Sequence, residues 1–163
     1  MGNIEKKMFV FKKMQLFDNF TEEDFQLLAE MTRVRKYAEK SIIIEERSES
    51  SDFYIVATGK IEIMKELQDG EYKRIAILSM GDFFGEMSLM DGGFTSARAQ
   101  TLNNAVLLVM SQEQFQFIMK NNPDFAFKIT YQIAKLLSQR LRKINEKYSF
   151  VSYAHQKALE KLK

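Results

Sequence analysis

The chain has 163 residues, about one domain, of which 45% are hydrophobic and 28% charged, as is typical of a folded globular protein. It contains no cysteine, which excludes disulfide bonds, thiolate metal sites and thiol catalysis. Its single histidine, His155, excludes a multi-histidine metal cluster. The net charge of +2 provides no overall attraction to nucleic acid. No apolar run approaches the roughly 18 residues of a membrane span, and residues 1–7 lack a signal-peptide core, so we expect a cytoplasmic protein.

The N-terminal part of the chain predicts two helices. Residues 8–17 form an apolar run that indicates a short helix. A second helix is expected to begin at Thr21, whose hydroxyl can cap it, and Asp24 three residues later completes the pattern of a capping box. Apolar residues at helical spacing follow, which gives this helix one face to pack against a core.

The central part of the chain, from Thr32 to Ser111, predicts β-strands. Its short runs are rich in β-branched and aromatic residues, and Asp69-Gly70 is the strongest hairpin signal between them. A succession of short strands and turns favours a barrel or sandwich over alternating strand–helix units. The main predicted strands cover residues 41–45, 53–57, 61–64, 75–78 and 105–110.

After Ser111 the sequence predicts helices again. Residues 112–120 indicate a short helix that ends at Asn121-Asn122-Pro123, and a much longer one runs from about Asp124 to the C-terminus. Helices on both sides of a group of strands indicate an α+β domain with the helices outside a barrel. We assign the strands and N-terminal helices to residues 1–122 and the long helix to residues 123–163.

One segment, residues 81–93, interrupts the strands with a single helical turn. Gly85 precedes this turn and Gly92 ends it. The first N–H groups of a helix lack intrahelical partners and favour an anion, and a glycine lets a ligand approach the backbone. Glu86 in the first turn can accept hydrogen bonds from sugar hydroxyls. The segment therefore predicts an anion site, next to a carboxylate that can accept hydrogen bonds from a sugar.

The run Phe84-Gly85-Glu86-Met87-Ser88-Leu89, entered through Gly81-Asp82-Phe83 and followed by Ser96-Ala97, resembles the phosphate-binding cassette of the cyclic-nucleotide-binding domain family. The resemblance extends over residues 16–141. It implies an antiparallel β-roll with N-terminal helices, a short cassette helix and a long C-terminal helix. It further implies that cAMP or cGMP binds with its phosphate at the cassette, and that the closing helix moves over the base.

The resemblance also implies roles for single residues. Glu86 matches the residue that holds the ribose 2′-hydroxyl, and Gly85, Met87 and Ser88 match positions whose backbone N–H groups face the ribose-phosphate. On the closing helix, Arg140 is a further ligand-binding candidate.

The sequence departs from the family at the phosphate. The family continues with Pro-Arg-Ser/Thr-Ala, and without gaps these positions hold Phe94, Thr95, Ser96 and Ala97, so the phosphate-binding arginine is missing. Loss of one partner of a buried charge pair costs about 2–5 kcal/mol, and a hydroxyl returns roughly 1 kcal/mol. Arg98, two residues after Ser96 and on the same face of a regular strand, is the candidate replacement.

The long helix carries a heptad seam that predicts a coiled coil and hence a homodimer. The seam alternates steps of four and three through Leu137, Leu141, Ile144, Tyr148, Val151, His155, Ala158 and Leu162. Residues 125–133, before the seam, are expected to pack back on the barrel instead.

Two functions remain open from the sequence. The first is a regulatory module that binds a cyclic nucleotide, with affinity reduced by the missing arginine, and signals through the long helix. The alternative is a degenerate module of the same fold that has lost the nucleotide and serves as a dimerisation or partner-binding scaffold, for instance for another signalling protein. An enzyme is not expected, because the sequence shows no nucleophile signature, P-loop or dinucleotide fingerprint. DNA binding is not expected either, because no winged-helix domain follows the long helix.

Overall fold

The computed structural model describes residues 3–160, excluding the side chains of residues 154–156, 158 and 159. Two helices and a 3-10 helix come first: α1 (Asn3–Phe11), η1 (Gln15–Phe17) and α2 (Glu22–Glu30). The strands are β1 (Arg33–Tyr37), β2 (Ile42–Ile44), β3 (Phe53–Thr58), β4 (Ile61–Glu66), β5 (Tyr72–Leu78), β6 (Phe83–Phe84), β7 (Arg98–Thr101) and β8 (Ala105–Met110). The remaining helices are α3 (Glu86–Asp91), α4 (Gln112–Asn121) and α5 (Pro123–Glu160).

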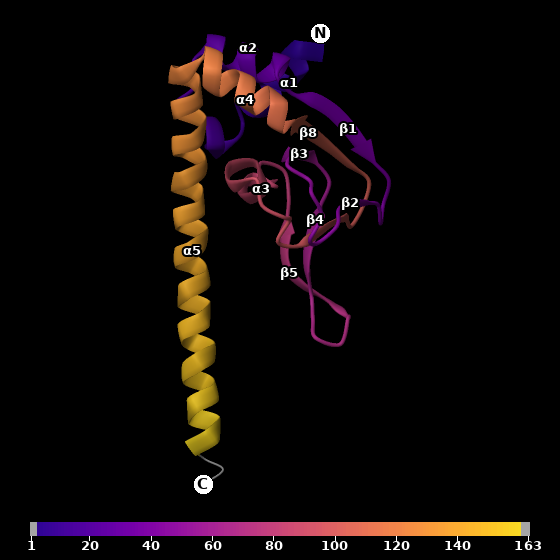
Figure 1. Ribbon diagram of the computed structural model, residues 1–163, viewed down its shortest axis with the longest axis vertical. Helices are drawn as coiled ribbons and strands as arrows, with labels where there is room; N and C mark the ends of the chain where they lie inside the picture. Colours follow the sequence, from indigo (N-terminus) through magenta and orange to yellow (C-terminus); the bar gives the residue numbers. More distant parts are fainter. Residues whose placement is uncertain (1–2, 161–163) are drawn as a thin grey trace.

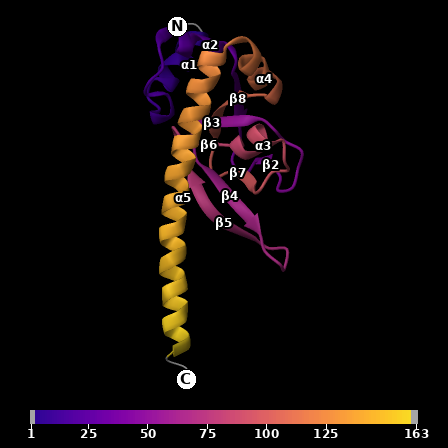
Figure 2. The ribbon, with the colours of Figure 1, turned by 60° about the vertical axis from the view of Figure 1, so that its left-hand side comes forward.

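The strands form two four-stranded antiparallel sheets, with the orders β1-β8-β3-β6 and β2-β7-β4-β5. Helices α1, α2 and α4 gather around the start of α5 at one end of the sheets, and α5 then runs past the strands (Figure 1). Figure 2 shows the β4–β5 hairpin projecting in the direction in which α5 continues. The predicted α+β fold, a β-roll with flanking helices, is confirmed.

Two clusters of apolar side chains form the core. The larger one joins the helices to the first sheet, and Phe11, Leu28, Phe53 and Ile129 are fully buried within it. The smaller one fills the roll between the sheets. The first turns of α5 belong to the larger cluster through Phe125, Ala126, Ile129 and Ile133, which confirms that this part of the helix packs back on the barrel.

The N-terminal helix differs from the prediction over residues 8–17. It begins at Asn3 and ends at Phe11, and η1 follows after Met14, which has an extended backbone (φ −103°, ψ 125°). The ammonium of Lys7 explains the early start, because it is buried and donates to the backbone carbonyls of Ala29 and Thr32 at the end of α2. Such a cation at a helix C-terminus satisfies carbonyls that lack intrahelical partners.

The capping box predicted at the start of α2 is present. The Asp24 backbone N–H donates to the Thr21 hydroxyl, and the Asp24 carboxylate accepts from the Thr21 backbone N–H at 2.8 Å. The same carboxylate accepts a hydrogen bond of 2.7 Å from Lys128 on α5. Asp24 therefore both caps α2 and ties it to α5.

The second half of α5 leaves the core. Among the seam residues, Leu137 still packs against the larger cluster, whereas Leu141, Ile144, Tyr148 and Val151 are exposed. The side chains of His155 and Ala158, and the whole of Leu162, lie outside the described residues. The coiled-coil dimer stays a prediction, and so does the division at residue 122.

Candidate functional site

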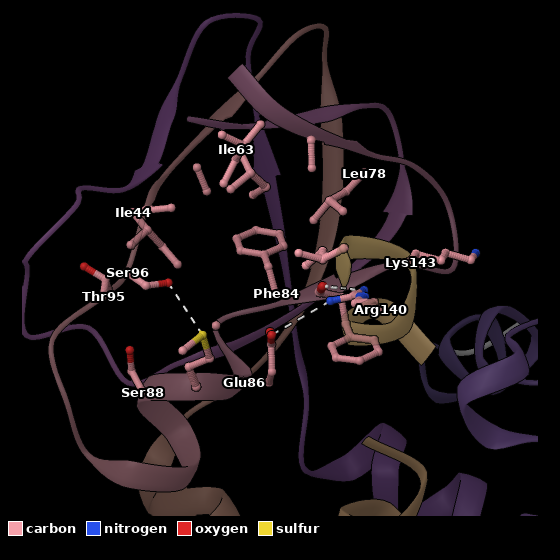
Figure 3. A pocket seen from close by; sticks show the side chains of 18 of the residues that line it. Ile44, Ile63, Leu78, Phe84, Glu86, Ser88, Thr95, Ser96, Arg140 and Lys143 are labelled. Atoms are coloured by element: carbon pink, nitrogen blue, oxygen red, sulfur yellow. Dashed lines mark hydrogen bonds and ion pairs between the residues drawn. The ribbon is translucent and has the colours of Figure 1, made fainter. Parts of the chain in front are cut away.

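A cavity of about 680 Å³ lies between the β-roll and α5. Its floor consists of apolar side chains from both sheets, and Figure 3 shows Ile44, Ile63, Leu78 and Phe84 around it. One wall is the start of α3 with the residue before it, Gly85 to Ser88, and a second wall is the segment of residues 95–97. Helix α5 forms the remaining side with Arg140, Lys143, Ile144 and Lys147.

The start of α3 has a backbone that requires glycine. Gly85 adopts φ +81°, and a Cβ at this position would lie 2.3 Å from the carbonyl oxygen of Asp52. A side chain here would strain the backbone and would require Asp52, just before β3, to shift. Gly92 ends the helix in the left-handed conformation, with φ +68°. The helical turn predicted between these two glycines is confirmed.

Glu86 places a buried carboxylate at the cavity. The residue is only 8% exposed, and burial raises the pKa of this carboxyl, although its own backbone N–H and Arg140 act in the opposite direction. Arg140 Nη1 lies 3.8 Å from Glu86 Oε1, and Arg140 Nη2 donates to the Phe83 carbonyl at 3.1 Å (Figure 3). The guanidinium also stacks over the Phe83 ring, 4.2 Å from its centroid. Arg140 thus connects α5 to the segment that begins α3.

Thr95, at the position of the missing arginine, is occupied with other contacts. Its hydroxyl donates to the Glu45 carbonyl at 2.5 Å and accepts from the Ser48 backbone N–H at 2.8 Å. In Figure 3 this hydroxyl points away from the cavity, whereas the Ser96 hydroxyl points inward and donates to the Met87 sulfur at 3.6 Å. Of these two hydroxyls, that of Ser96 therefore faces the cavity.

The structure does not bring Arg98 to the cavity. Its Nε donates to Glu45 at 2.8 Å, and its guanidinium lies over the Tyr72 ring at 3.7 Å. The next residue, Ala99, lines the cavity instead, because neighbouring residues on a strand point to opposite faces. The other predicted ligand-binding residues line one cavity: Gly85, Glu86, Met87, Ser88, Thr95, Ser96 and Arg140.

Three residues on α5 were not predicted at this site. Lys143, Ile144 and Lys147 follow Arg140 at steps of three, four and seven, which is the spacing of one helical face. That spacing could have identified them once Arg140 was assigned. The cations that line the cavity within the described residues all come from α5, and Glu86 provides the carboxylate. No group of residues in the described range could hold a metal ion, and no helix there is long and apolar enough to cross a membrane.

Comparisons with known proteins agree with this geometry. The family model of the cyclic nucleotide-binding domain matches residues 34–122, more than half of the chain. The chain is 28% identical over 142 residues to the cyclic AMP receptor protein of Thermus thermophilus, which covers 87% of this chain and 64% of that protein. It is 38% identical over 90 residues to the cGMP-dependent 3′,5′-cGMP phosphodiesterase A of Dictyostelium discoideum, which covers 55% of this chain and 10% of that protein.

A solved structure has the same fold. It is a cyclic nucleotide-binding domain from Methylobacillus flagellatus, with a TM-score of 0.79, 22% identity, and coverage of 88% of this chain and 81% of that one. The chain spans less than two thirds of the length of each of the two relatives named above. Each of them therefore matches it through only part of its own length. With the β-roll, the glycine-bounded helix α3 and the match over residues 34–122, the chain belongs to the cyclic nucleotide-binding domain family.

Proposed function

We propose that this chain is a regulatory module that binds a cyclic nucleotide, cAMP or cGMP, with reduced affinity and signals through α5. It is not proposed to be an enzyme, because the chemistry at the cavity is that of binding. Glu86 is the one carboxylate among the lining residues, and no histidine, nucleophile–base pair or metal group accompanies it within the described part of the chain.

The observation that carries this proposal is the position of Glu86. Its carboxylate is buried beside a cavity large enough for a nucleotide, and its contact with Arg140 is long, at 3.8 Å. A ribose hydroxyl would donate to this carboxylate and supply the hydrogen bond that burial has removed. Because the competing cation is on α5, ligand binding and the position of α5 would be coupled.

The phosphate end of the cavity supports the reduced affinity. Residues 95–97 contribute no cation, the Thr95 hydroxyl is already hydrogen-bonded, and Arg98 faces away from the cavity. Without a charged partner, a buried phosphate forfeits about 2–5 kcal/mol, which corresponds to about 30-fold to several thousand-fold in affinity.

The same observation favours a second candidate. Because the wall of residues 95–97 contributes no cation, the cavity also suits a module that has lost the nucleotide. Such a module would act as a dimerisation or partner-binding scaffold. The exposed seam on α5, with Leu141, Tyr148 and Val151, would then carry the function as a homodimer interface.

Calorimetric titration with cAMP and with cGMP distinguishes the two candidates. We expect saturable binding of at least one of them to the wild type, and its loss in Glu86→Ala, with binding retained in Glu113→Ala on α4 as the control. Absence of binding at millimolar nucleotide to a folded wild type would contradict the first candidate and favour the scaffold.

A further inference from the structure

The loop of residues 45–48, between β2 and β3, holds the 95–97 wall of the cavity from outside; we call this loop the clasp. The Arg47 backbone N–H donates to the Thr95 carbonyl at 2.8 Å, and the Thr95 N–H donates to the Ser48 carbonyl at 3.0 Å. The Thr95 hydroxyl adds its own bonds to Glu45 and Ser48. Thr95 is therefore hydrogen-bonded to the clasp through its backbone and its side chain.

An ion pair between Glu46 and the half-exposed Lys65 connects the clasp to the β4–β5 hairpin. The Glu46 side chain is only 1% exposed and accepts a hydrogen bond of 2.6 Å from Lys65 Nζ on β4. Its other oxygen accepts from the Glu66 backbone N–H at 2.9 Å. The hydrogen bond from Lys65, followed by that from Glu66, holds the pKa of the Glu46 carboxyl below its ordinary value. Glu46 is therefore charged and fully partnered.

Lys65 also reaches the cavity wall directly. Its ammonium donates a second hydrogen bond, of 2.6 Å, to the carbonyl of Ser96. Ser96 is the residue of this wall whose hydroxyl points into the cavity and contacts Met87 on α3. One cation thus fixes both the clasp and the residue that faces the ligand, although neither Lys65 nor Glu46 lines the cavity.

We propose that Glu46 and Lys65 are positioning residues that set the place of the 95–97 wall opposite α3 and thereby set the ligand affinity of the cavity. The side chains of this wall, Thr95 to Ala97, carry no charge, and their hydrogen-bonding groups act only from a fixed position. The inference that ligand affinity depends on the pair rests on the proposed function, whereas the control of the wall itself does not.

The energetic reason is the loss of both hydrogen bonds that Lys65 donates. When Lys65 is removed, the Glu46 carboxylate keeps its bond from the Glu66 backbone N–H but loses its charged hydrogen-bond partner. The clasp and the 95–97 wall then lose the bonds from Lys65 that tie both of them to β4. Thr95, bonded to the clasp through three groups, moves with the clasp. Truncation of Lys65 is therefore expected to loosen residues 95–97 without disturbing the larger core at the helical end of the molecule.

The experiment compares three single variants of the full chain. Lys65→Met removes the cation, and Lys65→Arg restores a donor of the same charge. Lys73→Met is the matched control, because Lys73 is the cross-strand partner of Lys65 on β5 and is exposed. Hydrogen exchange of the amides of Arg47, Ser48 and Thr95 is measured without ligand, and calorimetric titration with cAMP and cGMP follows.

In Lys65→Met we expect these three amides to exchange at least about tenfold faster, while amides of α2 and β8 keep their rates. Affinity for the nucleotide that the wild type binds should fall by about tenfold, and Lys65→Arg should recover most of both losses. Lys73→Met should match the wild type. Unchanged exchange at Arg47, Ser48 and Thr95, or faster exchange throughout the chain, would overturn the inference. If the wild type binds neither nucleotide, the proposed function fails, and the exchange measurement still decides whether this pair positions the wall.

Discussion

Arg140 on α5 lies closer to the carbonyl of Phe83 than to the carboxylate of Glu86: the two distances are 3.1 Å and 3.8 Å. Arg140 is thus held by the backbone just before α3, and its charge only partly compensates the carboxylate next to it. Because Glu86 is also buried, its oxygens retain capacity to accept hydrogen bonds from a ligand. The arrangement favours an incoming donor at Glu86, and it gives α5 a direct contact with the site.

The raised pKa of Glu86 predicts that a variant without its charge has a more stable fold and binds the ligand more weakly. Because the folded state has the higher pKa, it binds the proton more tightly, so this contribution to stability is present at low pH and is lost as the pH rises through the folded-state pKa. Glu86→Gln should therefore unfold at a higher temperature than the wild type at pH 7. At a pH below the ordinary value of a glutamate the two proteins should converge.

The same variant should bind cAMP at least about tenfold more weakly at pH 7, because the charged acceptor for the ribose hydroxyl is gone. Thermal unfolding across pH and calorimetric titration measure the two effects. Glu113→Gln, an exposed change of the same type on α4, serves as the control. A Glu86→Gln protein that is less stable than the wild type at pH 7 would show that the carboxylate is not an energetic cost to the fold.

Thr95→Arg tests the missing charge at the phosphate. The variant should bind cAMP or cGMP at least about tenfold more tightly, since a guanidinium at this wall adds a charged partner for the phosphate. It should also be less stable than the wild type, because the hydroxyl bonds to Glu45 and Ser48 are lost. Titration and thermal unfolding measure both effects.

Thr95→Met separates these two consequences. It loses the same hydroxyl without adding charge, so that its stability should fall as in Thr95→Arg while its affinity does not rise. Equal affinities of the two folded variants would contradict the alignment that places Thr95 at the position of the family's arginine.

The elements that the sequence predicted well are those with local signals. The capping box of Thr21 and Asp24 and the hairpin at Asp69-Gly70 lie where their residues indicate, and β8 covers the predicted residues 105–110. These signals depend on neighbours along the chain, or on a continuous run of side chains buried on both faces. The first strand, β1, was not predicted, because Arg33–Tyr37 is an exposed strand with charged side chains.

The residues of the candidate site likewise divide into those with a local sequence signal and those without one. The start of α3 could be predicted, because its glycines and Glu86 are adjacent in the sequence. Arg98 was expected on the face of Ser96, but β7 begins only at Arg98, so strand alternation does not extend back to Ser96. The bond between Lys65 and Ser96 joins residues 31 apart in the sequence, and nothing in either neighbourhood indicates it.

Asp24 predicts an acid-sensitive connection between α2 and α5. Burial acts to raise the pKa of Asp24, but the hydrogen bonds from Lys128 and from Thr21 outweigh it, so the pKa is lowered. Its contribution to stability is therefore complete above the unfolded-state value and is lost as the pH falls through the lower folded-state pKa. Asp24→Asn should lower the free energy of unfolding by about 1–3 kcal/mol at pH 7.

Chemical denaturation at pH 7 and at strongly acidic pH measures this effect, and the difference from the wild type should shrink in acid. The control is Glu23→Gln, which removes an exposed charge one residue earlier on the same helix. If Asp24→Asn and Glu23→Gln lower the free energy of unfolding equally, the contact between Asp24 and Lys128 stabilises the protein no more than an exposed surface charge does.

The exposed seam on α5 predicts a parallel homodimer. Leu141, Tyr148 and Val151 are more than half exposed and continue the heptad pattern, which a solitary helix has no physical reason to maintain. Ile144 belongs to the seam and also lines the cavity, so the test leaves it unchanged. Leu141→Lys with Val151→Lys should weaken the dimer by more than about a hundredfold, because two apolar contacts per chain are replaced by charges.

Sedimentation velocity at micromolar concentration measures the association. The control is Ser149→Lys with Tyr153→Lys, which adds the same two charges at exposed positions outside the seam. The control should remain dimeric, and added salt should tighten both it and the wild type, because the basic residues that flank the seam repel each other across a parallel pair. A wild type that sediments as a monomer, or a seam variant that forms the same dimer as the wild type, would show that the two chains do not meet along this face of α5.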